Sequence, residues 1–178
     1  MAILIAYYSR RGENYCSGTV KSLPKGNTER TAEFIHSAVG GDLFEAETVT
    51  PYPESYRACT EQAKAELHDN ARPELKAYPD LAGYDTIFLG YPNWWGTMPM
   101  CMFTLLERYN LTGKTIVPFC TNEGSGMGSS ERDLKWLCAQ RLGVQELMPL
   151  FCELDEVMIT LHTVSRRSPR AGNTATIT

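Results

Sequence analysis

Two adjacent tryptophans occupy a tight loop near the middle of this sequence. Trp94 and Trp95 belong to the segment Gly90-Tyr91-Pro92-Asn93-Trp94-Trp95-Gly96-Thr97-Met98-Pro99, which follows the short apolar run Tyr84–Leu89, a predicted buried strand. Neighbouring residues in an extended segment point to opposite sides, so one ring can pack inward while the other stays at the mouth of the sheet. A large π-surface in that place suits a flat ligand. The alternative is that both rings only plug the end of the sheet.

A second loop has the features of a phosphate site. Ser9–Thr28 follows the first predicted strand and ends in Gly26-Asn27-Thr28, at the start of a predicted helix. Free backbone N–H groups, the positive end of the helix dipole and the hydroxyls of Ser9 and Thr28 all suit a phosphate. The loop lacks the lysine and the spacing of a P-loop, and a plain helix cap at Asn27 or Thr28 explains the pattern about as well.

A third loop is rich in glycine. Thr121–Gly128 follows another buried strand, and its backbone can approach the edge of a planar ring closely enough to form hydrogen bonds with it. The Ser9–Thr28 loop suits a phosphate, the tryptophan loop offers an aromatic surface, and the glycine-rich loop offers backbone groups to the edge of a ring. Together they predict a site for a mononucleotide with a flat ring.

The elements that must position these loops alternate along the chain. Strand, loop and helix repeat four times, which predicts a parallel sheet with helices on both faces and right-handed crossovers. In such a sheet the ligand binds at the carboxyl ends of the strands, where all three loops begin. The predicted strands are Ala2–Tyr8, Asp42–Ala46, Tyr84–Leu89 and Thr115–Cys120, and the predicted helices are Arg30–Val39, Tyr52–Asn70, Met100–Tyr109 and Ser129–Gln140.

Composition excludes several functional classes. The 178 residues carry a formal net charge of −4, which argues against nucleic-acid binding, and no apolar run approaches the ~20 residues of a membrane span. The N-terminal apolar run is too short for a signal peptide, so a cytoplasmic protein is expected. The six cysteines and three histidines are scattered without the spacing of metal ligands, and no metal site is predicted.

The three loops closely resemble the corresponding motifs of flavodoxins and flavodoxin-like proteins. The matching segments are Ile3–Ser9 with Gly26–Thr28, then Gly90–Pro99, then Thr121–Gly126, and the resemblance covers roughly Met1 to Leu137. It implies an α/β fold, a three-layer doubly wound architecture with parallel strand order 2-1-3-4-5. It also implies FMN at the point where the winding reverses, a rule for which flavodoxin is itself a standard example.

The resemblance also implies roles for individual residues, although no residue reads as a dedicated acid, base or nucleophile and Glu123 is the nearest candidate. Trp94 or Trp95 would stack on the isoalloxazine ring, and Trp95, beside Gly96, is slightly favoured. The FMN-binding residues implied are Ser9, Asn27 and Thr28 at the phosphate; Pro92, Asn93, Trp94, Trp95 and Gly96 along the ring; Thr121, Asn122, Glu123, Gly124, Ser125 and Gly126 at the pyrimidine edge; and Arg10 in the Ser9–Thr28 loop.

Two segments depart from the family pattern. Gly12–Lys25 is inserted in the usually compact phosphate loop, and the chain lacks the amphipathic stripe of a closing C-terminal helix. Glu146–Cys152 is a candidate fifth strand, so residues 1–154 are predicted to form the FMN-binding domain and residues 155–178 an atypical basic, Thr-rich tail. We expect residues after about Val164 to be exposed and irregular, and Val157–Val164 to add an extended segment or to cover the bare face of the sheet.

Three functions are compatible with these features. The leading hypothesis is a small FMN protein that carries electrons between redox partners, steered by the excess of 21 acidic over 14 basic residues in Met1–Glu156. The second is an FMN-dependent oxidoreductase that takes electrons from NAD(P)H and reduces a quinone-like acceptor. The third, less favoured, is a flavodoxin-fold binding protein without FMN.

Overall fold

A parallel sheet forms the centre of the molecule, as the sequence predicts. The computed structural model describes residues 2–141, 146–147 and 150–153. Four strands, β1 (Ile3–Tyr7), β4 (Asp42–Glu45), β5 (Thr86–Pro92) and β6 (Thr115–Asn122), pair in the order β4-β1-β5-β6. The short segments β7 (Glu146–Leu147) and β8 (Leu150–Glu153) both pair with β6, also in parallel. The order 2-1-3-4 of the four main strands is therefore confirmed, and β7 and β8 pair with β6 on the side where a fifth strand was predicted.

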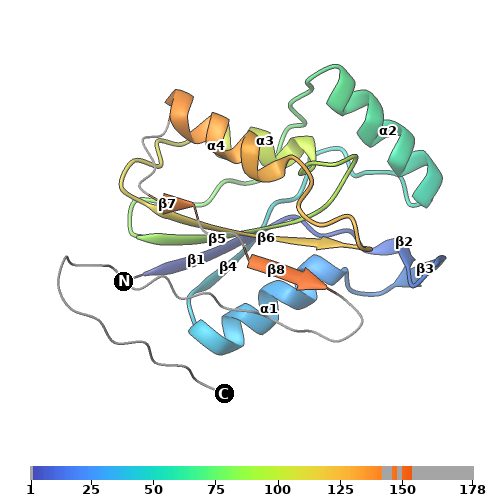
Figure 1. The fold of residues 1–178 in the computed structure, drawn as a ribbon, viewed down its shortest axis with the longest axis horizontal. Helices are drawn as coiled ribbons and strands as arrows, with labels where there is room; N and C mark the ends of the chain where they lie inside the picture. The colour runs from blue at the N-terminus through green and yellow to red at the C-terminus, as the bar shows by residue number, and fades with distance from the viewer. Residues whose placement is uncertain (1, 142–145, 148–149, 154–178) are drawn as a thin grey trace.

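Helices cover both faces of the sheet. Helix α1 (Asn27–Val39) lies on one face, whereas α2 (Tyr56–His68), α3 (Met100–Glu107) and α4 (Ser130–Arg141) lie on the other (Figure 1). Within the described residues, no helix combines the length and the apolar character that crossing a membrane requires.

Apolar side chains fill the space between the sheet and each helical layer. Because successive residues of a strand point to opposite faces, Leu4 and Leu89 pack toward α3, while Ile5 and Phe88 pack toward α1. Both faces of β1 and β5 are buried, which explains why these strands read as continuous apolar runs rather than as alternating patterns.

The inserted segment forms a β-hairpin, which the sequence analysis did not predict. Strands β2 (Gly12–Cys16) and β3 (Thr19–Leu23) pair antiparallel beyond the carboxyl edge of the sheet (Figure 1). Ser17 and Gly18 connect them with φ angles of 51° and 78°, the left-handed pair that a two-residue type I′ turn requires. The Ser-Gly pair was the available signal, but no residue of the two flanking strands is fully buried, so they lack the buried face that would give a strand pattern.

Several element boundaries differ from the sequence-based prediction. Strand β5 continues through Gly90 to Pro92, and β6 reaches Asn122, so both loops begin later than predicted. Neither Asn27 nor Thr28 caps α1, because the N-cap residue is Gly26. The predictions for the tail, residues 155–178, lie outside the described residues.

Gly90→Ala tests the packing between β5 and β6. A Cβ at Gly90 would run into the ring of Phe119, which is fully buried on the neighbouring strand. Overpacking of this kind should lower the free energy of unfolding by about 1–3 kcal/mol in urea denaturation. Gly83→Ala is the matched control, because a Cβ there meets nothing within 4 Å. A Gly90→Ala protein as stable as the control would contradict this close packing.

Candidate functional site

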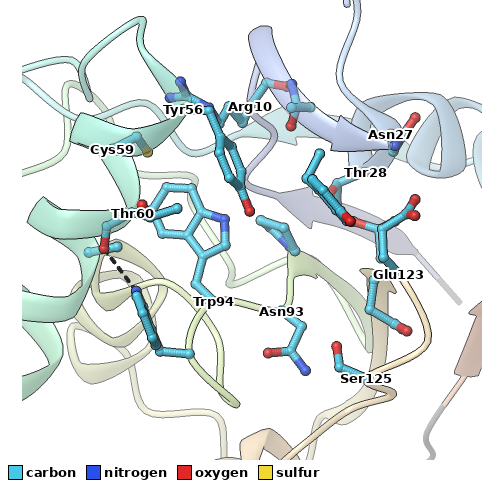
Figure 2. Close-up of a pocket in the computed structure, with 17 residues that line it drawn as sticks. Arg10, Asn27, Thr28, Tyr56, Cys59, Thr60, Asn93, Trp94, Glu123 and Ser125 are labelled. Atoms are coloured by element: carbon cyan, nitrogen blue, oxygen red, sulfur yellow. Dashed lines mark hydrogen bonds between the residues drawn. The ribbon is translucent and has the colours of Figure 1, made fainter. Parts of the chain in front are cut away.

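A large cavity opens at the carboxyl edge of the sheet. Its volume is about 530 Å³, within the ~300–1,000 Å³ of small-molecule sites. Helix α2, the β2–β3 hairpin, the start of α1 and the loops after β5 and β6 all contribute to its walls (Figure 2). The lining residues are Arg10, Asn14, Tyr15, Asn27, Thr28, Tyr56, Cys59, Thr60, Ala63, Pro92, Asn93, Trp94, Trp95, Thr121, Asn122, Glu123 and Ser125.

The structure brings most of the sequence-predicted residues into this one cavity. The predicted residues that line it are Arg10, Asn27, Thr28, Pro92, Asn93, Trp94, Trp95, Thr121, Asn122, Glu123 and Ser125. Ser9, Gly96, Gly124 and Gly126 are not among the lining side chains. The three glycines have positive φ angles and shape the loops instead, while Ser9 is buried beside α1.

A tight turn presents the two tryptophans. The N–H of Trp94 donates to the carbonyl of Thr97 at 2.8 Å, and the N–H of Thr97 donates back to Trp94 at 3.2 Å. Between them, Trp95 and Gly96 have φ angles of 54° and 84°, so this is a type I′ turn. A positive φ is unusual for a residue as large as tryptophan, and such backbone strain is concentrated at functional sites.

The two indole rings are held in different ways. Trp94 is half-buried and packs nearly perpendicular to Tyr8 and Tyr52, with ring centroids 5.3 and 4.9 Å away. Trp95 is 53% exposed; its indole N–H donates to the carbonyl of Thr60 at 2.9 Å, and the Lys64 ammonium lies 5.1 Å from its ring centroid. Both rings are thus fixed in the cavity wall, Trp94 by the core and Trp95 by α2.

Asn93 fastens the tryptophan loop to the glycine-rich loop. Its Oδ1 accepts a hydrogen bond from the N–H of Gly96 at 2.9 Å, and its Nδ2 donates to the carbonyl of Gly126 at 2.8 Å. The loops also meet where Gly128 packs against the carbonyl of Gly96, a contact that leaves no room for a Cβ. The N–H of Ser129 donates to the same carbonyl at 2.6 Å, so the two loops form one wall of the cavity.

The start of α1 forms a compact cradle under the cavity. A Cβ at Gly26 would collide with Ser9 Oγ and the carbonyl of Arg10, so the two ends of the first loop touch here. Ser9 Oγ accepts a hydrogen bond from the N–H of Glu29 at 3.0 Å and thereby caps the helix from a distance in sequence. Asn27 and Thr28, the first two residues of α1, line the cavity, so the positive end of the helix dipole lies beside it.

Thr28 connects this cradle to the glycine-rich loop. Its hydroxyl shares a hydrogen bond of 2.7 Å with the hydroxyl of Thr121, and both side chains are buried. The start of α1 and the end of β6, which leads into the glycine-rich loop, are therefore in direct contact beside the cavity.

Sequence reasoning missed the side of the cavity formed by the hairpin and α2. Tyr15 from β2 and Tyr56 from the first turn of α2 stack with ring centroids 6.2 Å apart and an interplanar angle of 27°. Tyr15 was hidden inside the insertion, and Tyr56 read only as a helix residue. The residues missed are Asn14, Tyr15, Tyr56, Cys59, Thr60 and Ala63.

Burial keeps two titratable side chains of the cavity, Cys59 and Tyr56, uncharged. Burial raises the pKa of the Cys59 thiol and of the Tyr56 hydroxyl, so both stay protonated at neutral pH. Burial also raises the pKa of Tyr8, which lies behind Trp94, well above its usual value. In the part of the chain that the structure describes, no group of three His, Cys, Asp or Glu side chains is arranged to hold a metal ion.

Comparison with known proteins assigns the fold to a family. The family model described as Flavodoxin matches residues 3–147. This chain belongs to the flavodoxin family. It is 27% identical over 117 residues to Flavodoxin 1 of Salmonella typhimurium, a match that covers 64% of this chain but only 49% of that relative.

Solved structures resemble the flavodoxin fold of this chain over most of its length. One is a protein of Bacteroides eggerthii classed provisionally as a flavoprotein, with a TM-score of 0.66 and 33% identity over 83% of this chain and 87% of that one. Another, a flavoprotein of Lactobacillus acidophilus crystallised in complex with FMN, has a TM-score of 0.61 and 23% identity over 83% of this chain and 92% of that one. The second likeness is one of fold alone.

Thr28→Val tests the buried hydroxyl pair. The substitution leaves the Thr121 hydroxyl without its partner, and we expect the free energy of unfolding to fall by about 1–3 kcal/mol. The double variant Thr28→Val/Thr121→Val should recover part of the loss, because removing both partners leaves no unpaired polar group. Urea denaturation of the wild type, both single variants and the double variant measures the coupling. Strictly additive losses would show that the two hydroxyls do not interact.

Proposed function

We propose that this flavodoxin-family protein binds FMN at the carboxyl edge of its sheet. The observation that carries the proposal is the convergence, in one cavity, of the α1 N-terminus, the tryptophan turn and the glycine-rich loop. The donor set fits the cofactor, since the tight cradle at Gly26 presents N–H groups for a phosphate and the cavity is large enough for a planar ring. Membership of the flavodoxin family supports the same ligand.

We assign roles to the residues of the cavity as part of this proposal. Asn27 and Thr28, with the first-turn N–H groups of α1, hold the phosphate, and Ser9 supports that helix start, because its Oγ accepts the N–H of Glu29. Trp94, Trp95, Asn93 and Pro92 form the wall along the ring. The pyrimidine edge is bound by the loop from Thr121 to Gly126, in which Asn122 Oδ1 already fixes the N–H groups of Gly124 and Gly126 at 2.9 Å each.

Electron transfer is the function we propose for the loaded protein. FMN supplies one- and two-electron redox chemistry when bound, and the chain orients it and sets its surroundings. The partners we propose are redox proteins with basic docking patches, because acidic residues outnumber basic ones over Met1–Glu156.

A specific observation also favours a second candidate, an FMN-dependent oxidoreductase. The tyrosine pair Tyr15 and Tyr56 extends the aromatic lining beyond the three loops, which offers a planar donor or acceptor a surface to stack on. Small quinone-like acceptors are the substrates that fit this alternative.

The binding proposal predicts one FMN per chain and strong discrimination against riboflavin. Several charge-assisted hydrogen bonds, each worth about 1.5–3 kcal/mol, are lost with the phosphate. Equilibrium dialysis with FMN and with riboflavin measures both affinities. Equal affinity would refute the phosphate site, and no uptake of either flavin would favour a binding protein without FMN.

The two tryptophans should contribute unequally to flavin binding. Trp95→Ala should weaken FMN binding more, because its ring is the more exposed of the two, while Trp94→Ala should cost more stability, because Trp94 packs against Tyr8 and Tyr52. Flavin fluorescence titration and urea denaturation separate the two effects. Quenching that survives in both single variants would contradict stacking by either ring.

Direct reduction by a nicotinamide distinguishes the carrier from the oxidoreductase. The FMN-loaded protein is mixed anaerobically with NADPH or NADH and no added reductase, and the yellow colour of the flavin is followed. A carrier keeps its colour, and an added flavodoxin reductase then bleaches it. Bleaching by the nicotinamide alone would establish the oxidoreductase instead, provided that a quinone-like acceptor then restores the yellow colour and the nicotinamide continues to be consumed.

A further inference from the structure

Arg10 is a buried cation in the wall of the cavity. Only 8% of the residue is exposed, although it carries a charge that is costly to remove from water. Both hydrogen bonds that the structure gives its guanidinium go to backbone carbonyls: Nε donates to Glu13 at 2.8 Å, and Nη2 donates to Glu54 at 2.6 Å. The planar guanidinium thus joins two segments that are 41 residues apart in sequence.

These two segments carry the tyrosine pair. Glu13 lies two residues before Tyr15 on β2, and Glu54 lies two residues before Tyr56 at the start of α2. A third bond closes the arrangement, because Oε2 of Glu13 accepts a hydrogen bond from the N–H of Tyr56 at 2.7 Å. The hairpin and α2 are therefore fastened to each other through residues within two positions of the two tyrosines.

The hairpin is held on its other sides as well. Asn14 Nδ2 donates to the carbonyl of Arg10 at 3.0 Å, and the N–H of Ser17 at the hairpin tip donates to Oε2 of Glu123 at 2.9 Å. Asn14 and Glu123 both line the cavity. The position of Tyr15 is thus determined by contacts to three separate parts of the site, of which Arg10 is the buried one.

We propose that Arg10 is a positioning residue for flavin binding. Its guanidinium holds the backbone of the hairpin and of α2 in the one arrangement that places Tyr15 and Tyr56 as an aromatic wall of the cavity. Arg10 then strengthens binding of the flavin ring rather than of the phosphate, since its donors are directed at the Glu13 and Glu54 carbonyls. This inference rests on the proposed FMN site and concerns how that site recognises the ring.

The test compares how Arg10→Met changes the affinities for FMN and for riboflavin, which share the ring and differ in the phosphate. A positioning residue affects both ligands alike, so we expect each affinity to fall by the same factor, roughly three- to tenfold, as when an aromatic contact is lost. Tyr15→Leu, a change of an exposed side chain that leaves the core intact, should produce a similar loss. The double variant should be little worse than either single one, because both remove the same wall.

Arg11→Met is the matched control. It removes the same charge from the adjacent position, but Arg11 is exposed and pairs with Glu29 and Glu45 outside the cavity lining. It should leave the affinity for riboflavin unchanged. If Arg10→Met weakens FMN binding at least tenfold more than riboflavin binding, the proposal is overturned and Arg10 is a phosphate ligand. The proposal is also overturned if Tyr15→Leu binds both flavins with wild-type affinity.

Hydrogen exchange separates this inference from the proposed function. In the flavin-free protein, Arg10→Met should accelerate amide exchange in residues 12–23 and at the start of α2, whereas Arg11→Met should not. If the wild type binds no flavin, the FMN proposal fails, and the exchange pattern still reports whether Arg10 holds the two segments together. Unchanged exchange in Arg10→Met would overturn the positioning role by itself.

Discussion

The parallel pairing of β5 with β6 is the constraint on which the site depends. The register places Pro92 opposite Thr121, so both strands end at the same level and their loops leave the sheet side by side. Asn93 and Thr121 then share a backbone hydrogen bond of 2.9 Å immediately beyond the last strand pairs. A shift of one residue would move each side chain to the opposite face and separate the loops. The buried contact of Gly90 with the Phe119 ring helps to hold this register.

From this pair of loops, fixed contacts extend to the rest of the site. The Thr28–Thr121 hydroxyl pair joins the start of α1 to β6, and Asn93 joins the tryptophan turn to Gly126. Each of these links is a hydrogen bond between segments that are far apart in sequence. The cavity is thus organised before a ligand enters, and a preformed site spends less of its binding energy on ordering the chain.

The hairpin and α2 add a part of the site that the three loops do not supply. Tyr15, Tyr56 and Trp95 line this part of the cavity. Tyr15 of the hairpin stacks on Tyr56 of α2, and the Trp95 indole donates a hydrogen bond to α2, so all three depend on elements outside the parallel sheet. A loop insertion is the least costly place to add such a wall, because lengthening a surface loop costs little in closure entropy. The strain at Trp95, whose φ angle is 54°, lies next to the same wall.

The sequence by itself predicted the parallel strands, the helices between them and the three loops at the site, while the strand order was implied by the resemblance to flavodoxins. Buried parallel strands appear as short continuous apolar runs, and Gly-Asn-Thr and the paired tryptophans are local signals at known places in the fold. Only the tertiary structure decided that Gly26 is the N-cap of α1 and that Ser9 Oγ accepts the N–H of Glu29 in its first turn. The tertiary structure also decided that Trp94 packs inward while Trp95 contacts α2. Only the tertiary structure showed that Tyr15 stacks on Tyr56 and that Arg10 donates to the carbonyls of Glu13 and Glu54, close to these tyrosines in the chain. Most of these contacts join residues that are 20 to 90 positions apart, and such contacts produce no periodic pattern in the sequence. Their partners can therefore be identified only from the folded structure.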